Sequence, residues 1–359
     1  MAPTGRPIPQ DVLDALRAQM AAEEERRATY GEVRPIISTV WQDHRFVAVG
    51  STLHWEKAEK WRTFTDFLGH FIKHVFGVHW GAAELQKPLA KRHVIMQWCE
   101  ALRQLQVRNP EPDDNGLCSG EPDGPSYAYL LLAYDLYLLG DHGKLRARFV
   151  ERLKLGEEFQ GARYELFVAA TMIRAGFDLE PENERDGSRQ HAEYIATHRR
   201  TKETFAVEAK SRRMPGVLGF VGEPVSEEKF QLDVRQPIKR ALGKKVAHPY
   251  IVFLDANMPP RYANDRRDEW IGNINRAVEL GDSSFNDVGI RVGSLFNFLA
   301  VTNVPDHYGE TGGPLPEPVF YSVRPAKAHR AVQNSDVFGD IERSLSQSHR
   351  VPGGFPPIE

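Results

Sequence analysis

One stretch of the chain restricts its possible folds more than any other. Between about residues 155 and 260 the pattern of side chains runs helix, strand, strand, strand, helix, strand. Apolar residues recur every three or four positions from Glu158 to Ala175, which is the period of a helix. The last strand-like run, His248 to Asp255, is apolar on both faces, as in a strand buried within a sheet. This order predicts an α/β domain.

The helix predicted over Glu158 to Ala175 carries a carboxylate among its apolar side chains. Glu165 shares a stripe with Leu166 and Ala169, spaced as one helix face requires. An unpaired carboxylate is costly in apolar surroundings, so Glu165 needs a partner. Two interpretations are open: the carboxylate pairs with an arginine in the interior, or it points at a cation or a catalytic group.

The residues after this helix predict three strands. Gly176 ends the helix, and residues 177–180 have the pattern of a short strand. A polar loop over 183–190 follows. The runs 192–198 and 204–210 are strand-like and separated by a short polar segment, which is the pattern of a β-hairpin.

The register of this hairpin predicts a cluster of charged side chains. If the turn is centred just after Arg200, Glu193 lies directly opposite Glu208, whereas a turn shifted by one residue would offset this pairing. Like charges in opposed positions destabilise a sheet, so the pair needs a cation between them. Glu208 and Lys210 are two positions apart and therefore share a face of the strand. We expect Glu193, Glu208 and Lys210 to converge, with Glu165 added from the preceding helix.

Carboxylate oxygens of this kind suit Mg²⁺ or Mn²⁺ better than zinc. A metal held by two carboxylates can activate water and neutralise a phosphodiester during in-line displacement. A lysine beside the metal can hold the attacking water or a phosphate oxygen. The chemistry that this cluster predicts is metal-assisted hydrolysis of phosphodiester bonds.

The order of Glu165, Glu193 and Glu208-Ala209-Lys210 resembles the PD-(D/E)xK nuclease superfamily. The resemblance implies a restriction-endonuclease-like core, in which a central mixed sheet is flanked by helices and the active site lies on one edge. It also implies that Glu193, Glu208 and Ala209 bind Mg²⁺ or Mn²⁺. Lys210 would position or activate water, and Glu165 would support the metal site.

The resemblance covers roughly residues 155–260 and departs from the usual pattern at one point. The superfamily usually has Pro-Asp where this chain has Ala192-Glu193, and a glutamate reaches one methylene further. Asp186 in the preceding loop is a fallback acid. A second Glu-x-Lys, at residues 227–229, lies in a helical context and carries no such meaning. A degenerate core that only binds nucleic acid or assembles with other subunits remains an alternative.

The distribution of charge predicts where nucleic acid would bind. The whole chain has 46 basic and 49 acidic side chains and a net charge of −3, but residues 201–250 carry 10 basic and 6 acidic ones. Such an excess indicates either a phosphate-facing surface or an ordinary solvated face. The resemblance adds a DNA-facing helix over 226–242, in which Pro237 must cause a break or a kink. The predicted contacts are Arg199, Arg200, Arg212, Arg213, Gln231, Arg235, Gln236 and Lys239.

At 359 residues the chain is long enough for about two domains. We expect an α-rich N-terminal region over 1–155, a nuclease-like domain over 156–330 and a C-terminal tail over 331–359. The N-terminal region would recognise the target, bind a partner protein or form a homodimer, and its tryptophans are expected in the core. The elements predicted there are helices over 11–28, 55–78, 83–106 and 127–139, with strand-like sequence over 34–51.

The composition excludes several classes of protein. With two cysteines, the chain cannot form a disulfide scaffold or a cysteine-based zinc cluster. Its longest apolar run is far shorter than the 18–20 residues, approximately, of a membrane span, and the N-terminus lacks an apolar signal core. We therefore expect a cytoplasmic protein with no membrane partner.

Together these features predict a Mg²⁺-dependent nuclease, and we expect an endonuclease acting on DNA. A role in restriction or anti-phage defence is implied only by analogy with the superfamily. Two alternatives stay open: a non-catalytic nucleic-acid-binding or assembly subunit, and a nuclease of repair or recombination. The sequence does not decide between DNA and RNA, nor does it indicate a cleavage sequence.

Overall fold

The computed structural model describes residues 10–108, 117, 120–182, 192–244, 246–286, 295–309, 315–326, 328 and 330–356. Its helices are α1 (Gln10–Tyr30), α2 (Phe64–Phe76), α3 (Val78–Leu85), α4 (Val94–Arg108), α5 (Gly124–Asp141), α6 (Ala147–Leu153), α7 (Gly156–Arg174), α8 (Arg235–Leu242), α9 (Pro260–Asp265), α10 (Arg267–Asn286) and α11 (Asp336–Gln347). Short 3₁₀ helices are η1 (Leu89–Lys91), η2 (Glu227–Lys229) and η3 (Asp306–Tyr308). The strands are β1 (Ser38–Trp41), β2 (His44–Val49), β3 (Thr52–Lys57), β4 (Phe177–Pro181), β5 (Tyr194–His198), β6 (Thr204–Ser211), β7 (Tyr250–Asp255), β8 (Phe298–Asn303) and β9 (Val319–Val323).

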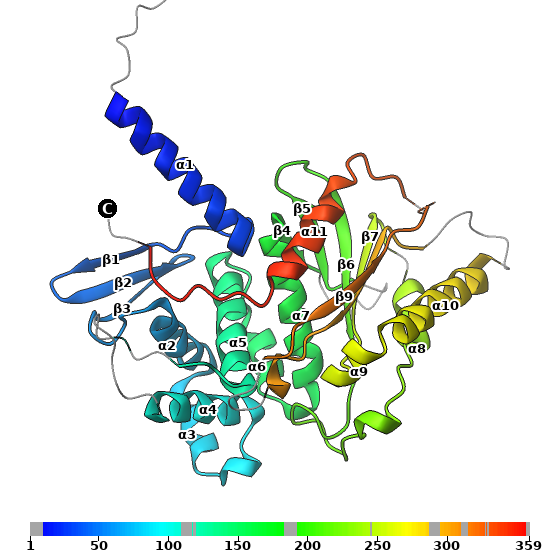
Figure 1. The fold of residues 1–359 in the computed structure, drawn as a ribbon, viewed down its shortest axis with the longest axis horizontal. Coiled ribbons are helices and arrows are strands. Elements are labelled where there is room, and N and C mark those ends of the chain that lie inside the picture. Colours follow the sequence, from blue (N-terminus) through cyan, green and yellow to red (C-terminus); the bar gives the residue numbers. More distant parts are fainter. Residues whose placement is uncertain are drawn as a thin grey trace, which may run out of the picture.

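The strands form two sheets, with α5 and α7 lying between them (Figure 1). The smaller sheet has the order β1-β2-β3 and is antiparallel. The larger one has six strands in the order β4-β5-β6-β7-β8-β9. Within it β6, β7 and β8 run parallel to one another, and the outer pairs are antiparallel. The predicted α/β class is therefore confirmed, and the larger sheet is mixed.

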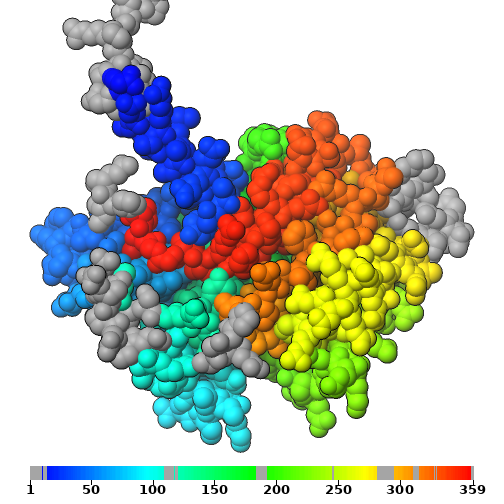
Figure 2. Space-filling model, in the orientation of Figure 1, coloured from blue at the N-terminus to red at the C-terminus, as the bar shows by residue number. Residues whose placement is uncertain are grey.

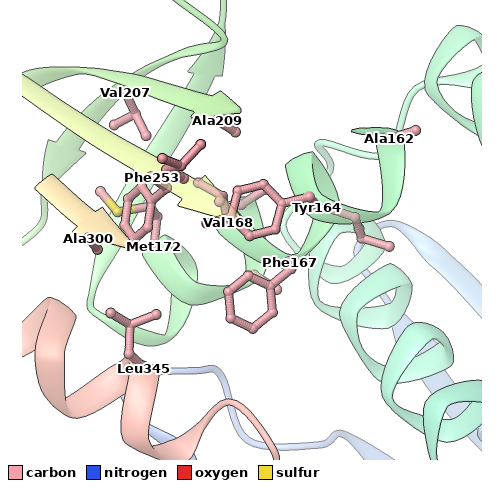
Figure 3. Close-up of a cluster of buried hydrophobic side chains, with 14 of the residues drawn as sticks. Ala162, Tyr164, Phe167, Val168, Met172, Val207, Ala209, Phe253, Ala300 and Leu345 are labelled. Atoms are coloured by element: carbon pink, nitrogen blue, oxygen red, sulfur yellow. The ribbon is translucent and has the colours of Figure 1, made fainter. Parts of the chain in front are cut away.

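Helices cover both faces of the six-stranded sheet, which explains why β7 and β8 are buried along their whole length. On one face Val207 and Phe253 meet Val168 and Met172 of α7, together with Leu345 of α11 (Figure 3). The opposite face is covered by α8 and α10. There the Tyr250 hydroxyl donates to the carbonyl of Ala241, and the Tyr321 hydroxyl donates to Asn275.

The order of elements around the hairpin confirms the predicted pattern of helix, strand, strand, strand, helix, strand. The second helix is shorter than expected, because α8 begins only at Arg235 and residues 227–229 form the separate turn η2. Pro237 therefore lies in the first turn of α8. A backbone N–H has no partner within the helix at that position, so the proline causes neither a break nor a kink.

The N-terminal region contains the second sheet and corrects one predicted helix. Residues 52–57 form β3, with Trp55 opposite Phe46, whereas a helix was expected from Trp55 onward. Helix α2 starts at Phe64, where Thr63 and Asp66 form a capping box. Trp41 is 63% exposed and Trp55 is 62% exposed, so the expectation that the tryptophans are core residues is wrong for these two.

Helix α5 joins the N-terminal region to the six-stranded half of the molecule. It is buried on most of its circumference and packs against both α2 and α7. Asp135 of α5 and Arg174 of α7 form a buried ion pair at 2.5 Å. Their surroundings belong to one continuous hydrophobic core that extends through both halves.

The predicted C-terminal tail contains a packed helix. Val337, Ile341 and Leu345 of α11 are buried, and the Ser344 hydroxyl donates to the carbonyl of Thr171 in α7. Beyond α11 the chain crosses the surface toward the smaller sheet (Figure 2, red). There the Phe355 ring lies 5.7 Å from that of Phe64. No described helix has the length and hydropathy that a bilayer crossing requires.

Candidate functional site

The hairpin of β5 and β6 has the register that the sequence predicts. Tyr194 pairs with Val207, and Thr197 pairs with Thr204. Glu193 directly precedes β5, and its backbone N–H donates to the carbonyl of Val207 at 3.0 Å. Glu193 therefore lies beside Glu208, the next residue along β6.

Lys210 contacts both carboxylates of the predicted cluster. Its ammonium nitrogen lies 3.5 Å from Glu193 Oε1 and also pairs with Glu208 Oε1. The Glu208 side chain is fully buried, and Glu193 and Lys210 keep 18% and 32% of their side-chain surfaces exposed. The structure thus brings Glu193, Glu208 and Lys210 together, with the lysine as the cation between two acids.

A second lysine reaches the same carboxylate. Lys244, which follows α8, places its ammonium 2.7 Å from Glu208. Lys244 is not among the residues that the sequence predicts for the site. The only signal for it was its membership of the basic block over 201–250, because the approach to Glu208 depends on how α8 packs on the sheet.

Glu165 has a direct partner in Arg152 of α6. The two side chains form a bidentate ion pair at 2.6 and 2.8 Å, and Arg152 also pairs with Glu158 at 2.9 Å. The first of the two interpretations of Glu165, pairing with an arginine, is therefore what the structure shows. Glu165 nevertheless lines the same pocket as Glu193, so it borders the cluster. Arg152 is likewise not among the residues that the sequence predicts for the site.

The environment shifts the ionisation of Glu193 and Lys210 in ways that follow from the geometry. Burial, followed by the negative charges of Glu165 and Glu208, raises the pKa of Glu193 to about 7, against the opposing effect of Lys210. Burial lowers the pKa of Lys210, but the carboxylates of Glu208, Glu193 and Glu165 outweigh this effect and the net pKa is raised. Lys210 is therefore protonated at neutral pH. The Glu193 carboxyl changes its ionisation state close to neutral pH.

The number of oxygen ligands near Lys210 limits the kind of metal site that could form. Within the described part of the chain, no group of three or more His, Cys, Asp or Glu side chains is arranged to hold a metal ion. Glu193 and Glu208 supply two carboxylates, and Ala209 could contribute only a backbone oxygen. Mg²⁺ commonly uses one or two carboxylates and takes its other ligands from water and substrate phosphates, so the residues fit this limited form. Asp186, the fallback acid, lies outside the described residues.

Two of the predicted nucleic-acid contacts lie far from this cluster. Arg199 and Arg200 occupy the hairpin turn, whereas Glu193 lies at the other end of β5, about 20 Å away at 3.3–3.4 Å per residue. Arg199 lies 3.6 Å from Asp178, and Arg200 lies 3.0 Å from Asp340. Both arginines are thus paired at the end of the hairpin away from Lys210.

The remaining predicted contacts follow β6 in the chain, in the segment before α8 and on α8 itself. Arg212 and Arg213 directly follow β6 and lie over the rings of Phe230 and Phe220, at 4.6 and 5.6 Å. The others are exposed residues on α8 or in the segment before it, and Arg235 lies 3.3 Å from Asp233. These exposed residues are Gln231, Arg235, Gln236 and Lys239.

Comparisons with known proteins assign no family or function to the chain. No family model matches the chain, and searches of the curated proteins and of the solved structures match nothing.

Proposed function

We propose that the protein is a metal-dependent nuclease that hydrolyses phosphodiester bonds of nucleic acid, with DNA as the substrate and endonucleolytic cleavage as the reaction. The observation that carries this proposal is the contact of Lys210 with both Glu208 and Glu193. A lysine between two carboxylates, on neighbouring strands of a mixed sheet next to α7, is the arrangement that the Glu-x-Lys pattern predicts. The proposal includes a restriction-endonuclease-like organisation of the six-stranded half.

In this proposal Glu193 and Glu208 would hold Mg²⁺, which when bound supplies charge neutralisation and activation of water. Lys210 would place its ammonium on the attacking water or on a phosphate oxygen, as a point charge. Glu165, already paired with Arg152, would act on the site through its charge. Its negative charge helps to raise the pKa of Glu193, so it favours a bound proton or cation at that carboxylate.

A second candidate function has specific support. Lys210 and Lys244 together neutralise the Glu208 carboxylate, and no third acidic ligand joins the two carboxylates within the described residues. A nuclease-like core that binds nucleic acid without cleaving it, as a subunit of an assembly, would have these properties. The exposed outer face of the smaller sheet, with Trp41, Leu53 and Trp55, would then serve as a protein contact.

The experiment that separates the two functions is a cleavage assay on supercoiled plasmid and on labelled single strands, with Mg²⁺ and with EDTA. The nuclease proposal requires products only with Mg²⁺, and their loss in Glu208→Gln together with weaker Mg²⁺ binding by calorimetry. Glu227→Gln, in the second Glu-x-Lys of the chain, is the matched control and should behave as wild type. Tight binding of nucleic acid without products would favour the non-catalytic subunit.

We place this activity in the cytoplasm, with a role in restriction or anti-phage defence. The N-terminal residues through about 155 would recognise the target or bind a partner, including a second copy of the chain. The defence role is tested by infecting cells with phage. Cells that express the wild-type protein from a plasmid should be protected, and cells that express Lys210→Ala should not.

A further inference from the structure

The smaller sheet turns one face toward α2 and the other toward solvent (Figure 1). On the inner face Val47 and His54 pair across β2 and β3 and are buried, and the His54 ring lies 5.9 and 5.5 Å from those of Phe67 and Phe71. Successive side chains of a strand point to opposite faces, so the register identifies the outer face. It consists of Ile37, Thr39 and Trp41, then His44, Phe46 and Ala48, and then Leu53, Trp55 and Lys57.

The outer face exposes large apolar side chains on both of its edge strands. Ile37, Trp41, Leu53 and Trp55 are each more than half exposed. Ile37 and Leu53 flank Ala48 near one end of the face, and Trp41 lies at the other end, beside the turn from β1 to β2. Single apolar residues are common on a protein surface, but a contiguous group of them marks a binding site.

The aromatic rings of the outer face form a row that crosses all three strands. Trp41 pairs with His44 across β1 and β2, and Phe46 pairs with Trp55 across β2 and β3. The rings of His44 and Trp55 lie 5.6 Å apart, which connects the two pairs. Every nucleobase has a π-face, and exposed aromatic side chains hold unpaired bases by stacking on them. The row therefore suits a single strand, because the bases of a duplex are already stacked on one another.

The charge of the outer face is compatible with a nucleic-acid strand. Lys57 is positive, and no outward position of the three strands, all of which lie in the described part of the chain, holds an aspartate or glutamate. The carboxylates nearest in sequence, Asp43 and Glu59, lie beyond the strand ends. Lys57 is 3.9 Å from Glu59, but both side chains are more than half exposed, so this pair is weak. The ammonium can exchange it for a phosphate oxygen.

We infer that the outer face of the smaller sheet binds unpaired bases of a nucleic-acid strand, which stack on Trp41 and Trp55. The inference rests on the proposed function for nucleic acid as the ligand, and it gives the N-terminal half a single-stranded target. The inner face, packed on α2, holds the strands in place, so the rings are presented by a rigid element. A protein partner on the same face, which the non-catalytic function would require, is the alternative that the experiment has to separate.

The test measures binding without cleavage. A fluorescein-labelled oligothymidylate is titrated in EDTA, with anisotropy as the readout. Trp41→Leu and Trp55→Leu keep an apolar side chain but remove the ring. Each should weaken binding by about 5- to 150-fold, the usual effect of losing one aromatic that stacks on a base. Trp55→Phe retains a ring and should bind within about fivefold of wild type.

Two further variants control for surface effects and for charge. Val78→Ala/Leu85→Ala shortens two exposed apolar side chains on α3, outside the sheet, and should leave binding unchanged. Lys57→Gln removes one phosphate contact and should lower the slope of log affinity against log salt by about 0.7, the value for a single strand. Unchanged thermal unfolding of the tryptophan variants shows that they are folded.

Three results would overturn the inference. One is wild-type affinity in Trp41→Leu/Trp55→Leu, and another is failure of the wild-type protein to bind the oligothymidylate. The third is a dimer of the free protein in sedimentation that Trp41→Ala/Trp55→Ala converts to a monomer, because a second copy of the chain would then cover the face. Since EDTA removes the metal, a protein that binds the strand through this face but never cleaves with Mg²⁺ would refute the proposed catalysis and keep this assignment.

Discussion

Lys244 and Glu208 lie 36 positions apart in the chain, yet their charged groups are 2.7 Å apart in the folded protein. Glu208 is fully buried, and a buried carboxylate requires compensation by opposite charge. Lys210 from the same strand and Lys244 from the end of α8 supply it. The carboxylate is therefore neutralised by two lysines, and any divalent cation that binds there must compete with their ammonium groups.

This competition predicts the effect of Lys244→Gln. Removing one ammonium should strengthen the attraction of Glu208 for Mg²⁺, because two charges about 4 Å apart interact by several kcal/mol at the effective dielectric of a protein. We expect half-maximal cleavage at a Mg²⁺ concentration several-fold lower than for wild type. A higher Mg²⁺ requirement would show instead that Lys244 holds Glu208 in position.

Lys210 is predicted to act on the reaction itself. Lys210→Ala should reduce the cleavage rate by about 10²–10³, the usual cost of losing a group that stabilises developing charge. Binding of DNA in EDTA should remain within about twofold of wild type, because phosphate contacts elsewhere hold the backbone. Single-turnover cleavage and anisotropy measure the two effects separately.

The chain contains its own control for this substitution. Lys229 ends the second Glu-x-Lys, in η2, where its side chain is exposed. Lys229→Ala should therefore cleave at the wild-type rate. Equal rates for Lys210→Ala and wild type would remove Lys210 from the mechanism.

The raised pKa of Glu193 predicts how stability depends on pH. Because this pKa is about 7, the folded state holds a proton that the unfolded state has already released above its ordinary value of 4.5. The folded state binds more protons, so the free energy of unfolding falls as pH rises from about 4.5 to 7. A difference of one bound proton changes the free energy of unfolding by at most about 1.4 kcal/mol per pH unit.

Glu193→Gln should flatten this dependence, as urea unfolding between pH 6 and 8 can measure. Burial raises the pKa of Asp135, Asp255 and Asp306 to about 6 in each case. Most of the pH dependence that these three aspartates add to the free energy of unfolding therefore lies below this pH window. Glu223→Gln alters an exposed carboxylate and should keep the wild-type slope. Equal slopes for Glu193→Gln and wild type would mean that Glu193 ionises normally.

The ion pair of Asp135 with Arg174 should contribute strongly to stability. Arg174→Met leaves the buried Asp135 carboxylate without its cation, and breaking a buried pair in this way costs about 3–5 kcal/mol. Because the pair joins α5 to α7, we expect one cooperative urea transition at a lower midpoint. Arg103→Ala removes an exposed ion pair on α4 and should change stability by less than about 1 kcal/mol. A loss equally small for Arg174→Met would show that the pair contributes little.

Elements with a strong local pattern could be predicted from the sequence. The apolar period gave the position of α7, and the short polar turn set the pairing of β5 with β6. Elements whose identity depends on distant partners could not. The aromatic residues around β3 suit either a helix or a strand, and β2 decides between them. Helix α11 is different, because the spacing of Val337, Ile341 and Leu345 is a local helical pattern in the sequence, and only its packing on α7 depends on the tertiary structure.

The sequence by itself determined that two strand-like runs form a hairpin, because only a short polar segment separates them. With the turn centred just after Arg200, as in the structure, the pairing places Glu193, Glu208 and Lys210 together. Only the tertiary structure decided what surrounds them. Lys244 approaches through the packing of α8 on the sheet, and Arg152 approaches through that of α6 on α7. These contacts join residues remote in sequence, and the buried area and charge compensation that select them exist only in the packed molecule.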